Sequence, residues 1–294
     1  MNEIIKLCEG YSRLDKTDNL YNLLEPFYIN EKTKPIKCAT PWKMIHKKTS
    51  DVAILALHGY KGYPGEMIYP GLKLYTAGFD VFCPRYPGHG VSKEDFCNTD
   101  MNDWLSCART SIGYLEKDYK EVYVMGHSMG ALIATIISKE FYVKKVALIA
   151  PAFNIKNLSY LKLKILKLYK NEISISWKGD KSFWGICERD EGDDDYLGKT
   201  YWSIINLKQI SELTKIKNLA LSSLNKLSSD TLCVIGDKDS SVDFMKVEKL
   251  LKKKLEKINI EVLKDVNHLC QYFNKKEKRD LCNDTIVNFF LDAE

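Results

Sequence analysis

Residues 121–137, EVYVMGHSMGALIATII, decide the fold. An apolar, β-branched run (121–125) predicts a buried strand that ends at Gly126, and an apolar helical pattern begins at Ser128. The Gly-x-Ser-x-Gly pattern between them occurs by chance in roughly one chain in ten of this length. Its position between a strand and a helix is more informative, because such a turn exposes a serine hydroxyl. The other interpretation is an N-cap serine on a glycine-rich turn.

Similar apolar runs lie on both sides of this stretch and predict a sheet. The other expected strands are residues 52–57, 80–83, 143–150, 231–235 and 259–263. Helical patterns cover residues 65–76, 101–118, 128–139, 241–257 and 276–291. Near-continuous apolar strands that alternate with helices favour an α/β fold with a mostly parallel, doubly wound sheet.

Two segments depart from this alternation. Residues 153–212 contain helix-like stretches but no convincing buried strand, and the acidic run 188–195 predicts a loop there. We interpret 153–212 as an inserted cap, so that residues 1–152 and 213–294 form one core. Residues 1–40 have no clear place in this core and are treated as an N-terminal extension.

The composition excludes several classes of protein. An apolar fraction of 45% in 294 residues is typical of a globular chain with a large core. The net charge of +5 comes from intermixed charges, so no nucleic-acid partner is expected. No apolar run is long enough for a transmembrane helix or a signal peptide. The nine cysteines include no Cys-x-x-Cys pair, which favours a reduced, cytoplasmic protein without a zinc site.

A serine nucleophile needs donors for the oxyanion that forms during attack. The N–H of Met129, at the start of the helix, supplies one candidate donor. The run LHGYKG (57–62) follows the strand 52–57 and supplies a second, for which we select the N–H of Tyr60. The alternative for 57–62 is a plain glycine-rich turn.

The serine also needs a base, and the base needs an orienting acid. Of the five histidines, only His268 lies in the loop after the last expected strand, where the base of this arrangement arrives. The acid is expected after strand 231–235, and we select Asp239 at the apex of that loop. Asp237 is the alternative as a turn-forming residue, and Asp243 as a helix cap.

These motifs together resemble the α/β-hydrolase superfamily, and within it the carboxylesterase and monoacylglycerol lipase-like group. The resemblance rests on LHGYKGYPGEM (57–67), CPRYPGHG (83–90), VYVMGHSMGALIA (122–134), GDKDSSV (236–242) and VNHL (266–269), in that order. It implies an α/β-hydrolase fold with Ser128 as nucleophile, Asp239 as acid and His268 as base. Ala131 departs from the second glycine that often follows the motif in relatives, which is a minor packing change.

The resemblance implies a serine esterase that forms an acyl-enzyme on a small ester substrate, without cofactor or metal. Short or medium acyl esters and monoacylglycerols are the expected substrates. A thioesterase or an aminopeptidase with the same triad remains an alternative, and so does a non-catalytic protein that binds a lipid surface or a partner.

The expected cap has residues suited to an apolar substrate. The stretch 158–169 has leucines and isoleucine at helical spacing with lysines elsewhere, which is typical of a helix packed on the core. It also fits a lid that contacts an acyl chain or transiently a membrane surface. Four aromatic residues are candidates to line the substrate pocket: Phe153, Trp177, Trp184 and Trp202.

Overall fold

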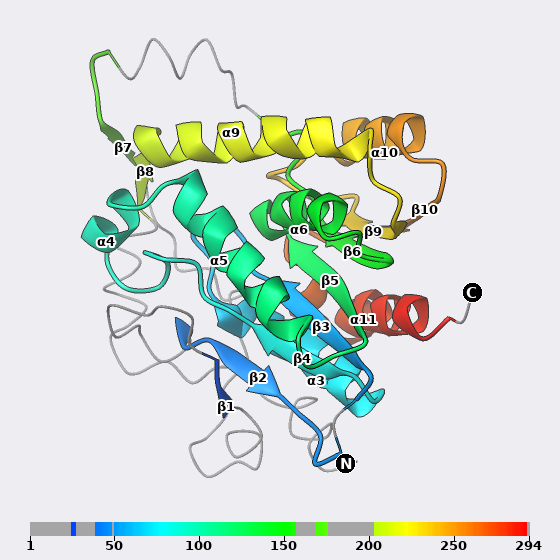
Figure 1. Ribbon diagram of the computed structural model, residues 1–294. Helices are drawn as coiled ribbons and strands as arrows, with labels where there is room; N and C mark the ends of the chain where they lie inside the picture. Colours follow the sequence, from blue (N-terminus) through cyan, green and yellow to red (C-terminus); the bar gives the residue numbers. More distant parts are fainter. Residues whose placement is uncertain (1–24, 28–38, 49, 157–167, 176–202, 293–294) are drawn as a thin grey trace.

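The computed structural model describes residues 25–27, 39–48, 50–156, 168–175 and 203–292 of the 294-residue chain (Figure 1). Its main feature is an eight-stranded sheet in the order β1-β2-β4-β3-β5-β6-β9-β10. The strands are β1 (Glu25–Pro26), β2 (Trp42–Met44), β3 (Val52–Leu57), β4 (Asp80–Cys83), β5 (Glu121–His127), β6 (Lys145–Ile149), β9 (Asp230–Gly236) and β10 (Ile258–Leu263). Six neighbouring strands of this sheet are parallel: β4, β3, β5, β6, β9 and β10. At one edge β2 pairs antiparallel with β4, and β1 pairs antiparallel with β2.

Helices cover both faces of this sheet, as Figure 1 shows. The longer helices are α3 (Ile68–Thr76), α5 (Met101–Leu115), α6 (Met129–Glu140), α9 (Leu207–Leu224), α10 (Phe244–Lys254) and α11 (Lys276–Leu291). Shorter segments are the 3-10 helices η2 (Pro64–Met67) and η4 (Cys270–Tyr272) and the helix α4 (Lys93–Cys97). Residues of α5, α6, α9 and α10 share one apolar core, and residues of α3 and α11 share a second.

The two cores follow from the two-residue period of the strands. In β3, Leu55 and Leu57 join the core under α5 and α6, while Ile54 and Ala56 join the core under α3 and α11. All four side chains are fully buried, and burial of a large aliphatic side chain contributes about 1.5–3 kcal/mol. A strand that is buried on both faces therefore has a continuous apolar sequence.

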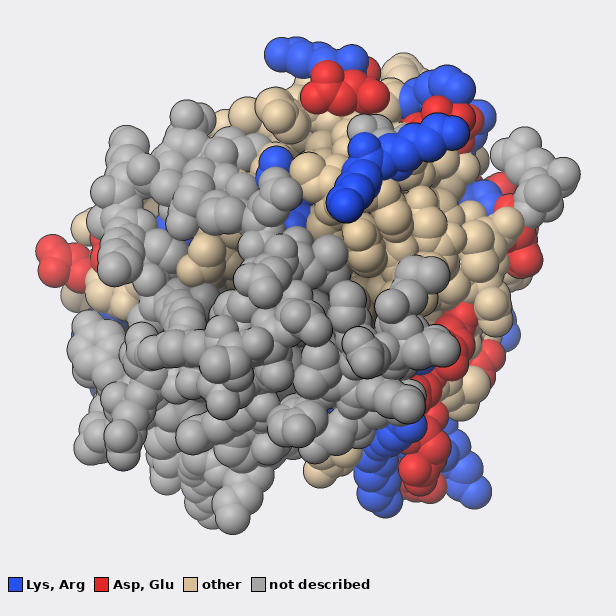
Figure 2. All heavy atoms as spheres, turned by 90° about the horizontal axis from the view of Figure 1, so that it is seen from below, with Lys and Arg blue, Asp and Glu red and all other residues tan. Residues whose placement is uncertain are grey.

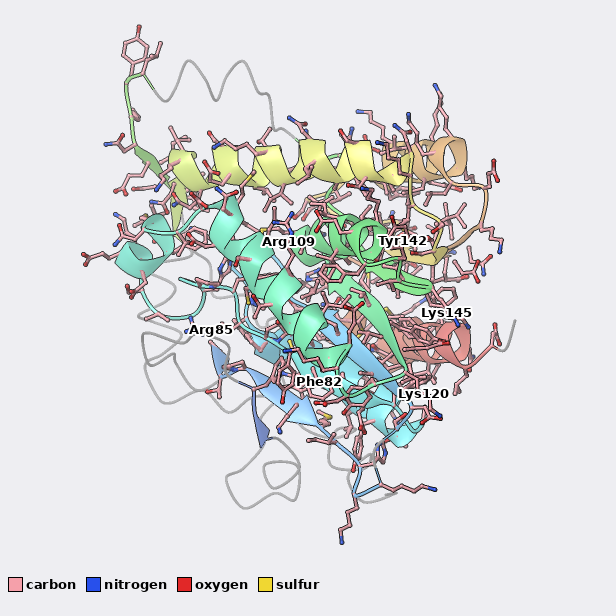
Figure 3. All side chains as sticks on the ribbon, in the orientation of Figure 1. Phe82, Arg85, Arg109, Lys120, Tyr142 and Lys145 are labelled. Atoms are coloured by element: carbon pink, nitrogen blue, oxygen red, sulfur yellow. The ribbon has the colours of Figure 1, made fainter. Side chains whose placement is uncertain are left out.

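A bidentate ion pair joins α5 to α6, which lie on the same face of the sheet. Arg109, labelled in Figure 3, extends from α5 and donates to both carboxylate oxygens of Glu140 at the end of α6, with each distance 2.8 Å. Two parallel N–H···O bonds fix the relative orientation of their partners more firmly than one. The contact holds the end of α6 that lies farthest from Ser128.

The predicted α/β-hydrolase fold with a mostly parallel, doubly wound sheet is confirmed. The strands 52–57 and 80–83 and the helix 276–291 have the predicted bounds, and the other predicted strands differ by one or two residues at one or both ends. Two short edge strands, β1 and β2, were not expected, and β1 falls inside the extension 1–40.

The segment after β6 differs most from the sequence-based expectation. It contains a small antiparallel pair, β7 (Glu172–Ser174) and β8 (Ile204–Asn206), followed at once by α9. α9 runs through position 212, where we expected the cap to end, and it packs against α6. Most of the expected helix 158–169 lies outside the described residues, while Leu168 and Tyr169 lie in a turn and are exposed.

Basic and acidic side chains are intermixed on the described surface (Figure 2), as the nearly balanced charge composition indicates. Blue and red side chains lie beside one another on the described part of the face in Figure 2. No helix among the described residues is both long and apolar enough to cross a membrane. Within the same residues the cysteines form no disulfide bond. The cytoplasmic location stays a prediction.

The junction of β5 and α6 depends on two glycines. A Cβ at Gly130 would lie 2.2 Å from the carbonyl oxygen of Leu57, and one at Gly126 would lie 2.3 Å from that of Gly130. Real Cβ atoms do not approach backbone atoms so closely, so any side chain at either position forces the helix away from the sheet.

We expect Gly130→Ala to lower the free energy of unfolding by about 3 kcal/mol, because α6 must shift against backbone that cannot move aside. Gly113→Ala is the matched control, since a Cβ at that position of α5 meets no atom within 4 Å. This control should gain about 0.5–1 kcal/mol. Urea unfolding measures both, and equal midpoints for the two variants would contradict the prediction.

Candidate active site

Ser128 lies on the tight turn between β5 and α6. Its backbone has φ 55° and ψ −110°, a region that non-glycine residues rarely adopt, and its N–H donates to the carbonyl of Ile149 at 2.9 Å. Although Ser128 occupies the N-cap position of α6, its hydroxyl makes no capping hydrogen bond. The strained turn therefore directs the hydroxyl away from the helix.

The structure brings three of the predicted site residues into one hydrogen-bonded chain. Nε2 of His268 lies 2.9 Å from Oγ of Ser128, and Nδ1 of His268 lies 2.7 Å from Oδ2 of Asp239. Ser128 and His268 are half-buried, and the carboxylate of Asp239 is fully buried. Asp239 therefore meets His268 away from solvent.

Strand register explains why these distant residues meet. Leu57 at the end of β3 pairs with Gly126 of β5, and Leu263 at the end of β10 pairs with Gly236 of β9. The loops that follow these strands consequently leave the sheet at the same edge. In parallel α/β sheets this carboxyl edge is where ligands bind.

The carboxylate of Asp239 has a full set of donors. Oδ1 accepts from the backbone N–H groups of Ser241 at 2.7 Å and Val242 at 2.8 Å, while Oδ2 accepts from His268. Burial alone would raise the pKa of Asp239, but the hydrogen bond and the charge of His268, with the two backbone donors, bring it below its ordinary value. Asp239 is thus held as an anion that fixes the imidazole.

The two alternative acids have other contacts. Oδ1 of Asp237 accepts from the N–H of Asp265 at 2.7 Å, which joins the loop after β9 to the loop after β10. Asp243 caps α10 by accepting from the N–H of Lys246. Of these three acids, Asp239 is the one whose carboxylate lies within hydrogen-bond distance of His268.

The 58–62 loop lies beside the serine. A Cβ at Gly59 would come within 3.5 Å of Cβ of Ser128. The carbonyl oxygen of Gly59 accepts from the N–H of Gly62 at 3.1 Å and lies 3.0 Å from Nδ1 of His58. Because the peptide bond is planar, these contacts also fix the direction of the Tyr60 N–H.

His58 joins this loop to the next one along the sheet. Its Nε2 accepts from the N–H of Tyr86 at 3.2 Å, which leaves Nδ1 as the donor to Gly59. Burial, with a smaller contribution from His89, lowers the pKa of His58 to about 3. A neutral ring with one donor and one acceptor satisfies both contacts.

The expected pocket residues are only partly described. Phe153 is 3% exposed and belongs to the core under α5 and α6. Trp177, Trp184 and Trp202 lie outside the described residues. Within the described part of the chain, no group of three or more His, Cys, Asp or Glu side chains is arranged to hold a metal ion.

Sequence reasoning missed two buried residues at this edge. Glu66 and His127 contact each other and the loops around Ser128. A glutamate beside the apolar run that opens α3 was the available signal, because buried carboxylates require partners.

This sheet, with a serine on the turn between strand and helix, defines an α/β-hydrolase. Residues 48–271 match the Hydrolase_4 family, described as serine aminopeptidase, S33. The match covers more than half of the chain, so the protein belongs to this family. The predicted resemblance to carboxylesterases and monoacylglycerol lipases is confirmed by its relatives.

Two curated relatives match part of the sequence. A thermostable monoacylglycerol lipase of Bacillus sp. (strain H-257) is 30% identical over 32% of this chain and 38% of its own length. A carboxylesterase of Bacillus subtilis (strain 168) is 26% identical over 46% of this chain and 55% of its own length. The aligned segments thus span about two fifths and just over half of these relatives.

Solved structures match over a longer range and show the fold. A structure described for the metagenome-derived lipolytic enzymes LipS and LipT has a TM-score of 0.73 at 18% identity, covering 88% of this chain and 100% of its own. A soluble variant of monoglyceride lipase from Saccharomyces cerevisiae has a TM-score of 0.65 at 15% identity, covering 91% and 98%.

Asp239→Asn should flatten the acid limb of the stability profile. The lowered pKa of Asp239 means that its carboxylate stabilises the fold fully above the unfolded value, about 3.9, and that this contribution is lost as the pH falls through the folded value. We expect the wild-type free energy of unfolding to fall more between about pH 5 and pH 2.5 than that of the variant. Urea midpoints across this range test it, and parallel profiles would contradict it.

Proposed function

We propose that the protein is a serine hydrolase that cleaves carboxylic esters through an acyl-enzyme on Ser128. The observation that supports this most directly is the hydrogen-bonded chain from Ser128 through His268 to Asp239 on a strained strand-to-helix turn. A buried acid, an imidazole and a half-buried hydroxyl in this order form a nucleophile with its base and orienter.

In the first step the hydroxyl of Ser128 attacks the ester carbonyl. Nε2 of His268 takes the serine proton, the new C–O bond forms, and the carbonyl π electrons move onto oxygen. Asp239 holds the Nδ1 proton of the ring and stabilises the imidazolium. The tetrahedral intermediate then expels the alcohol, which takes the proton from Nε2 and leaves the acyl group on Ser128.

The negative oxygen of the intermediate requires two converging donors, for which we assign the N–H groups of Tyr60 and Met129. The fixed Gly59 carbonyl supports the assignment of Tyr60. Met129 is the first residue of α6, where the helix leaves N–H groups without partners inside the helix. Water then attacks the acyl-enzyme while Nε2 of His268 takes its proton. The bond between the acyl carbon and Oγ of Ser128 breaks, the acid leaves, and Oγ takes the proton back from His268.

We assign substrate selection to the chain between β6 and α9, as a cap that ends at 206 because α9 begins there. Contacts at both ends support this placement. Ile155 bridges Val242, and Lys156 donates to the carbonyl of Asp239. At the other end, Nζ of Lys61 donates to the carbonyl of Ile204.

The proposed substrates are short or medium acyl esters, including monoacylglycerols. The names of the matched relatives support this class. Hydrolysis of aminoacyl amides by the same residues is the second candidate, because the family carries the description of a serine aminopeptidase. A purely binding role would give the Ser128–His268–Asp239 arrangement no physical purpose.

Ser128→Ala should lower kcat for p-nitrophenyl butyrate at least about 10³-fold, because the nucleophile is removed. The matched control is Ser138→Ala, which removes a buried hydroxyl from the same helix and should retain activity. A fluorophosphonate probe should label the wild type and the control but not Ser128→Ala. Full activity of Ser128→Ala would overturn the proposal.

Turnover on p-nitrophenyl esters from acetate to laurate, monoacylglycerols and aminoacyl 4-nitroanilides separates the two candidates. We expect kcat/KM to be highest within the ester series, because the relatives are esterases and lipases. A larger kcat/KM on the anilides, with the same loss in Ser128→Ala, would instead establish the aminopeptidase.

A further inference from the structure

Glu66 places a carboxylate in the protein interior, beneath the 58–62 loop. It belongs to η2, is 3% exposed, and its Oε2 accepts from the N–H of Gly59 at 3.2 Å. A Cβ at Gly62 would lie 2.1 Å from its Oε1, so the loop leaves room for the carboxylate only because position 62 is glycine. Such burial is unfavourable for an acid unless a partner compensates for it.

The partner is His127, the residue that precedes Ser128. Its Nδ1 lies 3.3 Å from Oε2 of Glu66, and its Nε2 lies 3.0 Å from the backbone oxygen of His268. The ring is buried, and its centroid is 5.0 Å from that of the His268 ring. One side chain thus spans the interior between the 58–62 loop and the loop that carries the proposed base.

The chemistry of these contacts differs from that around His58. A carboxylate and a carbonyl are both acceptors, so each ring nitrogen of His127 faces an acceptor. Burial opposes ionisation of Glu66, but the hydrogen bond and charge of His127, with His58 and the Gly59 N–H, lower its pKa below the ordinary value. The contacts therefore favour a charged carboxylate on the pair.

We propose that Glu66 and His127 are a positioning pair, which holds the 58–62 loop and the backbone of His268 in fixed relation to Ser128. The inference rests on the proposed function. Glu66 accepts from the N–H of Gly59 and so fixes that residue. The carbonyl of Gly59 lies in one peptide plane with the N–H of Tyr60, so the direction of this N–H is fixed as well. His127 transmits the same constraint to the main chain of His268.

The pair acts on the transition state more than on substrate binding. The oxyanion donors and the base form their strongest hydrogen bonds in the transition state, when charge has developed on the substrate oxygen and on the imidazole. A small displacement of the Tyr60 N–H or the His268 ring should therefore lower kcat with little change in KM. A residue that only supports the fold would change the melting temperature without this pattern.

Two variants disturb the carboxylate by different routes. Glu66→Met removes both acceptor oxygens at similar volume. Gly62→Ala keeps the acid but forces it to move, since its Cβ would overlap Oε1. We expect each to lower kcat on p-nitrophenyl butyrate about 10- to 100-fold with KM within about threefold of wild type. Gly113→Ala serves as the glycine control and should keep kcat.

The double variant separates positioning from stability. Glu66→Met and His127→Phe each leave buried polar groups without partners, so each should lower the melting temperature. Together they replace the pair by apolar side chains, and stability should partly recover. We expect kcat of the double variant to stay as low as that of the worse single variant, because the loop anchors are still missing.

Asp80→Asn is the control for loss of a buried acid elsewhere. Asp80 accepts from His46, Ser50 and Tyr119. It is the first residue of β4, so it lies at the amino ends of the parallel strands, whereas Ser128 lies at their carboxyl ends. It should lower the melting temperature and leave kcat unchanged.

The outcomes distinguish this inference from the proposed function. An active wild type whose Glu66→Met and Gly62→Ala variants keep kcat, or whose double variant regains kcat along with stability, overturns the positioning pair alone. A wild type that hydrolyses none of the substrates and is not labelled by the fluorophosphonate overturns the proposed function, and the positioning pair with it.

Discussion

The geometry of the candidate active site depends on how closely α6 approaches the carboxyl ends of β3 and β5. The backbone oxygens of Leu57 and His58 leave no space for a Cβ at Gly130, and Gly126 is equally confined. Because the helix starts in direct contact with the sheet, Ser128, midway between the two glycines, takes a positive φ. The surrounding packing must supply the free energy for this strained turn, which fixes the hydroxyl of Ser128 before any substrate arrives.

The remaining groups reach this hydroxyl through the order of the strands. β3 and β5 end in register, and so do β9 and β10, so four loops leave one edge together. Below them two buried histidines, His58 and His127, join neighbouring loops with different hydrogen-bond partners. His58 accepts from the N–H of Tyr86 and donates to the carbonyl of Gly59. His127 lies between the carboxylate of Glu66 and the carbonyl of His268. The edge is thus built of loops that support one another through the interior.

Much of this arrangement could be predicted from the sequence, and for physical reasons. β3 is a continuous apolar run and β4 is apolar after Asp80, as expected for strands buried on both faces. Ser128 lies where a strand pattern changes to a helix pattern. The choice of Asp239 over Asp237 relied on loop position, and the structure places Asp239 against His268.

Other features were missed for equally physical reasons. β1 and β2 were missed because strands of two or three residues show no periodic pattern. α9 was missed because serines and lysines interrupt its apolar pattern. Glu66 was missed because its contacts are made across the fold and leave no spacing in the sequence.

The anchoring of the chain after β6 has a consequence for how such a protein diversifies. Ile155 bridges Val242 just beyond the acid loop, and the chain returns at β8, where Lys61 contacts it, before α9 packs on α6. Both attachment points are set by the core and not by the residues between them. Since loop-closure entropy grows only slowly with length, the intervening segment is free to lengthen, shorten or be exchanged between relatives. With the role proposed for this segment, substrate selection can change while Ser128, His268 and Asp239 keep their positions in the core.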